Sequence, residues 1–171
     1  MSCLITSGQN PIPCKTMNGV NAVYIGNWSP SLTYVLASDT ITIGTFSGGT
    51  SSFYTFLQNP EVSEYTAPAE VSNENNAYKF TQTVKFALYN LTATNILLIK
   101  TLAQTQNSVI ILDNNGNYYM MGITSPALIS ALDGGLGKAG NDLNGYMLTI
   151  ISIANVPITP MTAHAALQVI V

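Results

Sequence analysis

The chain has 171 residues, a length that suits one domain with a sizeable core. Hydrophobic residues make up 47% of it and charged residues only 8%, against about 25% in an average globular protein, so we expect partners to cover much of its surface. A net charge of −3, no arginine and only five lysines exclude a basic surface that grips phosphates, and therefore nucleic-acid binding by attraction.

The first residues lack the charged start and apolar core of a secretory signal. No apolar run reaches the roughly 18 residues that a membrane helix needs, so we expect no membrane insertion. Cys3 and Cys14 are too few for a zinc site and no histidine pair accompanies them. We expect both cysteines to be reduced and structural.

The first third of the chain predicts short strands. Residues 1–20 are rich in turn-forming residues and indicate a surface arm or loop. We expect a meander of strands at 21–27, 32–37, 40–46 and 51–58. Trp28 ends the first of these strands, and we expect it to close the core rather than to form a ligand platform.

Residues 59–77 carry half of the carboxylates, namely Glu61, Glu64, Glu70 and Glu74. A solvated β-ribbon or loop is the simplest interpretation, because clustered charges usually face water. Long excursions in a compact domain are also often functional. An acidic ribbon that reaches a neighbouring subunit, or that repels DNA phosphates, would explain both its length and its sign. Paired carboxylates also occur in glycosidases, but no other catalytic signature accompanies these.

The central unit, residues 78–123, is the framework. Alternation over 78–91 predicts a strand with Tyr78, Phe80, Val84, Phe86 and Leu88 on its buried face. Thr92 or Thr94 can then cap an amphipathic helix through Gln106, with Leu91, Leu98, Ile99, Leu102 and Ala103 on its apolar flank. Leu97 projects on the polar side, either as a single exposed leucine or as a subunit contact. Strands at 108–113 and 117–123 flank Asp113-Asn114-Asn115-Gly116 and predict a hairpin.

The last third combines a glycine-rich loop with strands. Residues 125–133 suit a strand or a short helical turn, and 146–156 a strand, after which Pro157 and Pro160 break the sheet. Gly135, Gly137 and Gly140 have the spacing of a dinucleotide fingerprint, but no helix follows them, and Lys138 lies in no P-loop. We interpret 134–140 as a flexible loop. The apolar tail 161–171 either returns to the sheet edge or pairs with a neighbour.

Catalytic patterns are missing from the sequence. There is no nucleophile elbow and no metal-ligand cluster, and His164, the single histidine, suits a structural or exposed role. Two glycosylation sequons, at Asn27 and Asn90, are interpreted as accidental because no secretion signal accompanies them. We expect no enzyme activity and no cofactor.

Several stretches together resemble small structural proteins of tailed bacteriophages, above all crAss-like phages of Bacteroidetes. They cover roughly residues 1–160 and include MSCLITSG, NAVYIGN, FYTF, the helix TATN…LLIKTLAQ, the hairpin DNNGNYYMMG and the glycine-rich loop before NGYMLTI and NVP. In size and pattern these proteins are similar to tail-tube proteins. The tail after Pro157 departs from the pattern, which leaves the type of ring open.

The resemblance implies a mainly β fold with one flanking helix, a barrel or sandwich of the tail-tube type. A single domain would span 1–160, with an apolar arm at 161–171. The implied function is a virion structural protein of the tail or neck, a stacked homo-oligomeric ring of six or more subunits that binds other tail or neck proteins and lets DNA pass without specific binding. The subunit contacts that we expect involve Glu61, Glu64, Glu70, Glu74, Leu97, Gly134, Gly135, Gly137, Lys138, Val169 and Ile170.

Two other classes stay open. A capsid decoration or head-completion protein would form trimers or cap single sites. A carbohydrate-binding module would expose an aromatic platform that includes Trp28 and tyrosines 24, 34, 54, 65, 118 and 119.

Overall fold

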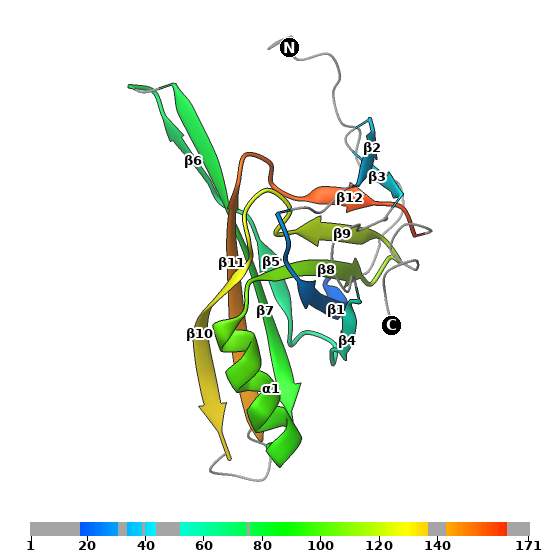
Figure 1. The fold of residues 1–171 in the computed structure, drawn as a ribbon, viewed down its shortest axis with the longest axis vertical. Helices are drawn as coiled ribbons and strands as arrows, with labels where there is room; N and C mark the ends of the chain where they lie inside the picture. Colours follow the sequence, from blue (N-terminus) through cyan, green and yellow to red (C-terminus); the bar gives the residue numbers. More distant parts are fainter. Residues whose placement is uncertain are drawn as a thin grey trace.

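In the part of the chain that the structure describes, the fold is mainly β, with two sheets and one helix. A computed structural model describes residues 18–30, 34–38, 40–43, 52–74, 76–136 and 143–163. Within these residues the sheets are not closed into a barrel, and their arrangement resembles a sandwich (Figure 1). The prediction of a mainly β fold with one helix is therefore confirmed. No helix of the described part is long and apolar enough to cross a membrane.

The first sheet has seven strands in the order β2-β3-β12-β9-β8-β1-β4. Its central strands are β1 (Val20–Asn27) and β8 (Asn107–Asp113), which are buried on both faces and therefore read as nearly continuous apolar runs. The other members are β2 (Val35–Ala37), β3 (Thr40–Ile43), β4 (Tyr54–Leu57), β9 (Tyr118–Met121) and β12 (Thr159–Met161).

The second sheet has the order β10-β11-β7-β5 and is built around the long strand β7 (Ala77–Tyr89). On one side β7 pairs along its length with β11 (Gly145–Ala154), which in turn pairs with β10 (Leu128–Gly135). On the other side β7 pairs first with β6 (Ala69–Ser72) and then with β5 (Glu64–Thr66).

The main core lies between the two sheets. It joins Val23 and Ile25 of β1 to Val84 and Phe86 of β7. The ring of Phe56, on the first sheet, lies 5.7 Å from the ring of Phe86 on the second, measured between centroids. Since alternate residues of β7 face this core, the strand's predicted inner face is confirmed at Val84, Phe86 and Leu88.

A second apolar cluster covers the opposite face of the seven-stranded sheet. Its buried members are Ala22, Tyr24, Ile41, Phe53, Ile110, Met120 and Met161. Burial and the neighbouring Tyr118 raise the pKa of the Tyr24 phenol. The sheet is thus a middle layer with apolar packing on both sides.

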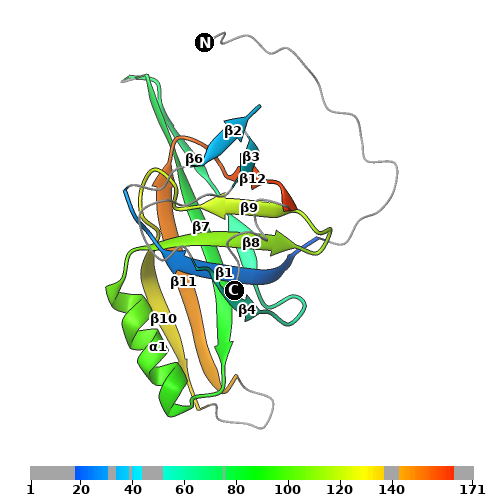
Figure 2. The same ribbon diagram turned by 45° about the vertical axis from the view of Figure 1, so that its right-hand side comes forward.

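The helix α1 (Ala93–Gln104) lies against the five-stranded sheet beside β10 (Figure 2). The Thr92 hydroxyl accepts a hydrogen bond from the Asn95 amide at 3.2 Å, which confirms the predicted cap. The helix ends two residues before the predicted Gln106, because the Gln106 carbonyl accepts from the Trp28 amide and Asn107 pairs with Ala127. Ile99 and Leu102 are buried in the main core, whereas Ala103 is exposed.

The predicted hairpin is confirmed. β8 and β9 pair around the Asp113 turn, where Gly116 has a φ of 83°. One oxygen of the Asp113 carboxylate accepts from the Asn115 and Asn117 amides at 2.9 and 2.7 Å. These bonds hold the turn that joins two buried strands.

The predicted meander is wrong except for its middle pair, because β1 pairs with β8 and β4 and not with β2. β2 and β3 pair as expected, but β4 pairs with β1 at the opposite edge of the sheet. Phe53, just before β4, packs on Gly26 of β1, where an added Cβ would lie 3.1 Å from the ring. This long-range contact, rather than proximity in sequence, selects the partner of β4.

The prediction that Pro160 breaks the sheet is also wrong. Pro160 lies in β12, opposite Tyr119 of β9, while β12 meets β3 only at Met161, opposite Ile41. At Pro160 the strand therefore has a partner on one side only, so the missing N–H costs little. Met161, assigned to the C-terminal arm, is a buried part of this strand. Residues 164–171 of that arm lie outside the described residues.

Candidate functional site

A two-stranded ribbon projects from the body of the molecule in both views (Figures 1 and 2). It consists of β6 and the first residues of β7, that is Ala69–Ser72 paired with Ala77–Phe80, and we refer to it as the ribbon. The predicted excursion at 59–77 is thus β-structured from residue 64 onward. The ribbon makes its strand pairing internally and leaves both of its faces accessible.

The two faces of the ribbon differ in chemistry. Val71 lies opposite Tyr78, and Ala69 opposite Phe80, so these four side chains share one apolar face. Val71 is 70% exposed and Tyr78 59% exposed, and the Tyr78 ring meets the Phe80 ring edge-on with centroids 6.2 Å apart. The other face carries the exposed ion pair of Lys79 with Glu70, at 3.1 Å.

Sequence reasoning placed Tyr78 on the buried face, and this is wrong. The alternation is right, since Tyr78 shares the parity of Val84 and Phe86, but β7 continues past the body and nothing described covers that end. Tyr78, Val84 and Phe86 lie on the same face of β7, but a side chain on that face is buried only where another part of the fold packs over it. The short alternation of Ala69 and Val71 was the missed signal for an apolar ribbon face.

The opposite end of the molecule exposes a second group of apolar side chains. Leu97 on α1 is 64% exposed, which confirms that it projects away from the core. Ile96 beside it and Leu136 just after β10 are also exposed. Figure 1 shows the beginning of α1 and the end of β10 together, at the end of the molecule farthest from the ribbon. We call Ile96, Leu97 and Leu136 the helix-end residues.

The four predicted glutamates do not converge on one site. Glu64 pairs with Lys85 at 2.6 Å on the five-stranded sheet, and Glu70 pairs with Lys79 on the ribbon. Glu74 lies exposed in the ribbon turn, and Glu61 lies in a separate turn with a φ of 64°. Two of the four are thus beside lysines, and this part of the chain is less acidic at its surface than its sequence suggests.

The predicted glycine loop begins later than expected. Gly134 and Gly135 are the last residues of β10 and pair with Tyr146 and Gly145 of β11. A Cβ on Gly134 would lie 2.1 Å from the Gly145 carbonyl oxygen, so the close approach of the two strands requires glycine there. Gly137 and Lys138 lie outside the described residues, as do Val169 and Ile170.

Aromatic side chains are spread over the fold. Trp28 is half-buried, its indole N–H donates to the Ile123 carbonyl at 3.3 Å, and it belongs to neither of the two apolar clusters. Tyr24 is buried, and the phenol of Tyr65 donates to the Pro157 carbonyl. Tyr54 is 61% exposed but lies on a different strand from Tyr78. Tyr24 is therefore not available for an aromatic platform.

Among the described residues, no three His, Cys, Asp or Glu side chains come together as metal ligands. Cys3, Cys14 and His164 lie outside that part of the chain.

Comparison with protein-family models, with curated proteins and with solved structures found no match. The argument for function therefore rests on the residues and on their placement.

Proposed function

We propose that the chain is a structural subunit of a tailed-bacteriophage virion, without enzyme activity, that assembles into stacked rings of the tail tube or neck. The channel of such rings would let genome DNA pass. The sequence resemblance suggests this class, and the exposed apolar surfaces support assembly of some kind.

The observation that carries the proposal is the ribbon with its apolar face. Exposed large apolar side chains are costly for a monomer with little surface charge, because charge normally limits association. The ribbon and the helix-end residues differ in shape and lie at opposite ends (Figure 1). A contact between two different surfaces is heterologous, and such contacts build rings or filaments rather than closed dimers.

The charge distribution suits a channel through which DNA moves without being held. Of the three lysines in the described residues, Lys79 and Lys85 are paired with glutamates. The whole chain has a net charge of −3. Contacts with phosphates would need unpaired, clustered cations to gain affinity from counterion release.

Mass measurement of the purified chain across a concentration series tests the assembly. We expect a discrete oligomer of six or more subunits at high concentration, and we expect Leu97→Asp to weaken it while the monomer stays folded. Gln104→Glu adds the same charge at another exposed position of α1 and serves as the matched control. Native rings formed by Leu97→Asp would refute the role of Leu97.

The other two classes give different results in the same measurement. A capsid decoration or head-completion protein would stop at a closed trimer or stay monomeric. A carbohydrate-binding module would stay monomeric and bind glycans.

A further inference from the structure

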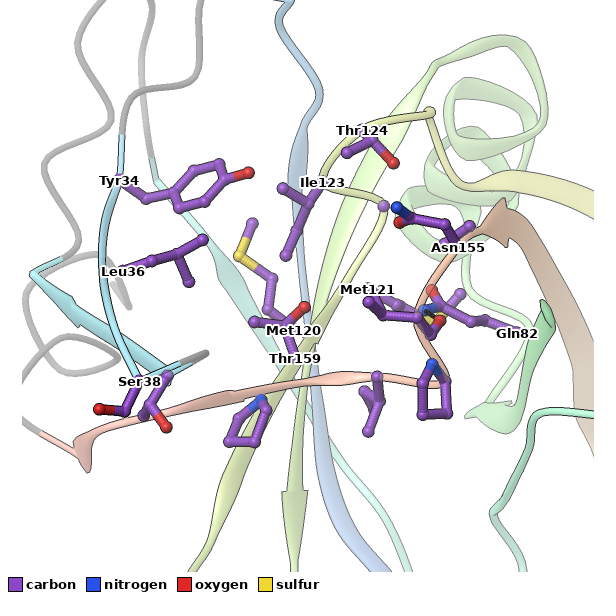
Figure 3. A pocket seen from close by; sticks show the side chains of 17 residues that line it. Tyr34, Leu36, Ser38, Gln82, Met120, Met121, Ile123, Thr124, Asn155 and Thr159 are labelled. Atoms are coloured by element: carbon purple, nitrogen blue, oxygen red, sulfur yellow. Dashed lines mark hydrogen bonds between the residues drawn. The ribbon is translucent and has the colours of Figure 1, made fainter. Parts of the chain in front are cut away.

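A cavity of about 510 Å³ lies beside the end of β11 (Figure 3). Its walls come from β2, β9, β12 and the segment between β11 and β12. Small-molecule sites in proteins commonly measure about 300 to 1,000 Å³ and are mostly apolar with a few fixed polar groups. The size alone suits a site for a small group.

The lining is uncharged and largely apolar in the described residues. Tyr34, Leu36, Met120, Ile123 and Pro157 contribute rings, branched chains and a thioether. Figure 3 shows the Met120 side chain directed between Tyr34, Leu36 and Ile123. No cation is present among these residues to pair with a carboxylate or phosphate, and no anion to pair with an amine. An uncharged ligand is therefore favoured.

One buried polar atom of the lining has no partner. Gln82 is 2% exposed and lies on the inner face of β7, at a position where Val84 and Phe86 continue the apolar pattern. Its side-chain amide donates to the Val156 carbonyl at 2.9 Å, which fixes the orientation of the amide. The Gln82 Oε1 atom accepts no hydrogen bond from the described residues of the protein. Gln82 is one of the residues that line the cavity (Figure 3).

An unpaired buried acceptor is rare in native proteins, because it forgoes hydrogen bonds with water and gains nothing in return. The glutamine therefore indicates an external donor. The nearby Ser152 hydroxyl does not supply it, since it donates to the Ser125 carbonyl at 3.2 Å.

We propose that this cavity binds an uncharged aromatic group that carries one N–H or O–H donor, and that the donor bonds to Gln82 Oε1. An aromatic group fits because thioethers, here Met120 and Met121, make favourable contacts with aromatic rings. The site does not depend on ring assembly. The same group can come from a free small molecule or from a tyrosine side chain of a neighbouring subunit.

Indole and 1-methylindole are the matched probes, because they share the aromatic body and differ at the N–H. We would label the methionine methyl groups with carbon-13 and titrate the full chain by NMR. Indole is expected to shift the Met120 and Met121 signals in a saturable way and to leave Met147 unchanged, since Met147 does not line the cavity. 1-Methylindole is expected to bind about fivefold more weakly, as the loss of one hydrogen bond predicts.

The variant Gln82→Met removes the acceptor and keeps a side chain of similar length. It is expected to bind the two probes equally. Equal affinity of the two probes for the wild-type chain would overturn the proposal, as would a preference for indole that persists in Gln82→Met. The comparison of probes on the wild-type chain keeps the test decisive if the variant does not fold.

If the unassembled chain binds indole as expected, the same titration on the assembled protein identifies the source of the aromatic group. Loss of indole binding on assembly would assign the cavity to a neighbouring side chain. Retained binding would assign it to a free ligand.

Discussion

Removing the apolar face of the ribbon should separate assembly from folding. The change is Val71→Thr with Tyr78→Thr, which puts a β-branched side chain suited to a strand at both paired positions. The two native side chains are 70% and 59% exposed, so in the monomer Val71→Thr should alter the free energy of unfolding by no more than about 0.5 kcal/mol, and Tyr78→Thr by about 0.5 to 1.5 kcal/mol because it removes the edge-on contact with Phe80.

The effect on association follows from the same exposures. Fully burying a large apolar side chain is worth about 1.5 to 3 kcal/mol, so covering the exposed share of each should contribute about 1 to 2 kcal/mol. The double variant should therefore weaken each subunit contact by about 2 to 4 kcal/mol, which corresponds to roughly 30- to 900-fold in the association constant.

Sedimentation across a concentration series measures that constant, and thermal unfolding of the dilute chain measures the monomer. The control is Glu70→Gln with Lys79→Gln, which removes the exposed ion pair from the opposite face of the ribbon and should change either value by less than about 1 kcal/mol. Unchanged association in the threonine variant would refute a contact through the apolar face. A large fall in monomer stability would refute its exposure.

Three further predictions concern the body of the fold. Leu102→Ala should lower the free energy of unfolding by about 2 to 5 kcal/mol, because Leu102 is buried. Leu97→Ala should lower it by less than about 0.5 kcal/mol, because Leu97 is exposed. Equal losses in urea unfolding would contradict the orientation of α1. Thr92→Ala should cost about 1 kcal/mol and Thr94→Ala much less, because only the Thr92 hydroxyl caps the helix; circular dichroism melts would show the difference. Burial raises the pKa of the Tyr65 phenol above its ordinary value of 10.0. The unfolded chain therefore releases this proton first, and the free energy of unfolding falls as the pH rises above that value. In Tyr65→Phe this fall should be shallower, and an identical slope in alkaline unfolding would argue against burial.

Features fixed by neighbouring residues were predictable from the sequence. The turn at Asp113 depends on the Asp113 carboxylate and on the positive φ at Gly116, and both residues belong to one stretch of four consecutive residues. The Thr92 cap is equally local. The alternation of β7 gave the correct inner face over its second half, because two sheets and the helix enclose that part.

Features that depend on distant partners were not predictable. Nothing near β4 in sequence states that it joins β1, and this pairing rests on Phe53 against Gly26. Pro160 could enter a strand because β3 reaches β12 only at the next residue. Gln82 occupies a position that alternation predicts to be apolar, and its place at a cavity follows only from the fold.

The candidate contact surfaces were likewise predictable only where the local pattern decides exposure. Leu97 was found from the helical pattern alone, since its exposure follows from the angle between it and the buried Ile99. Tyr78 was assigned to the wrong environment, because a strand's alternation does not reveal where the strand leaves the body.

Negative-stain electron microscopy of the purified chain, over a range of concentrations, tests the central claim most directly. Assembly into rings or tubes of one diameter, with a central hole wide enough for duplex DNA, is the predicted result. A chain that stays monomeric or stops at a closed trimer at every concentration would contradict it.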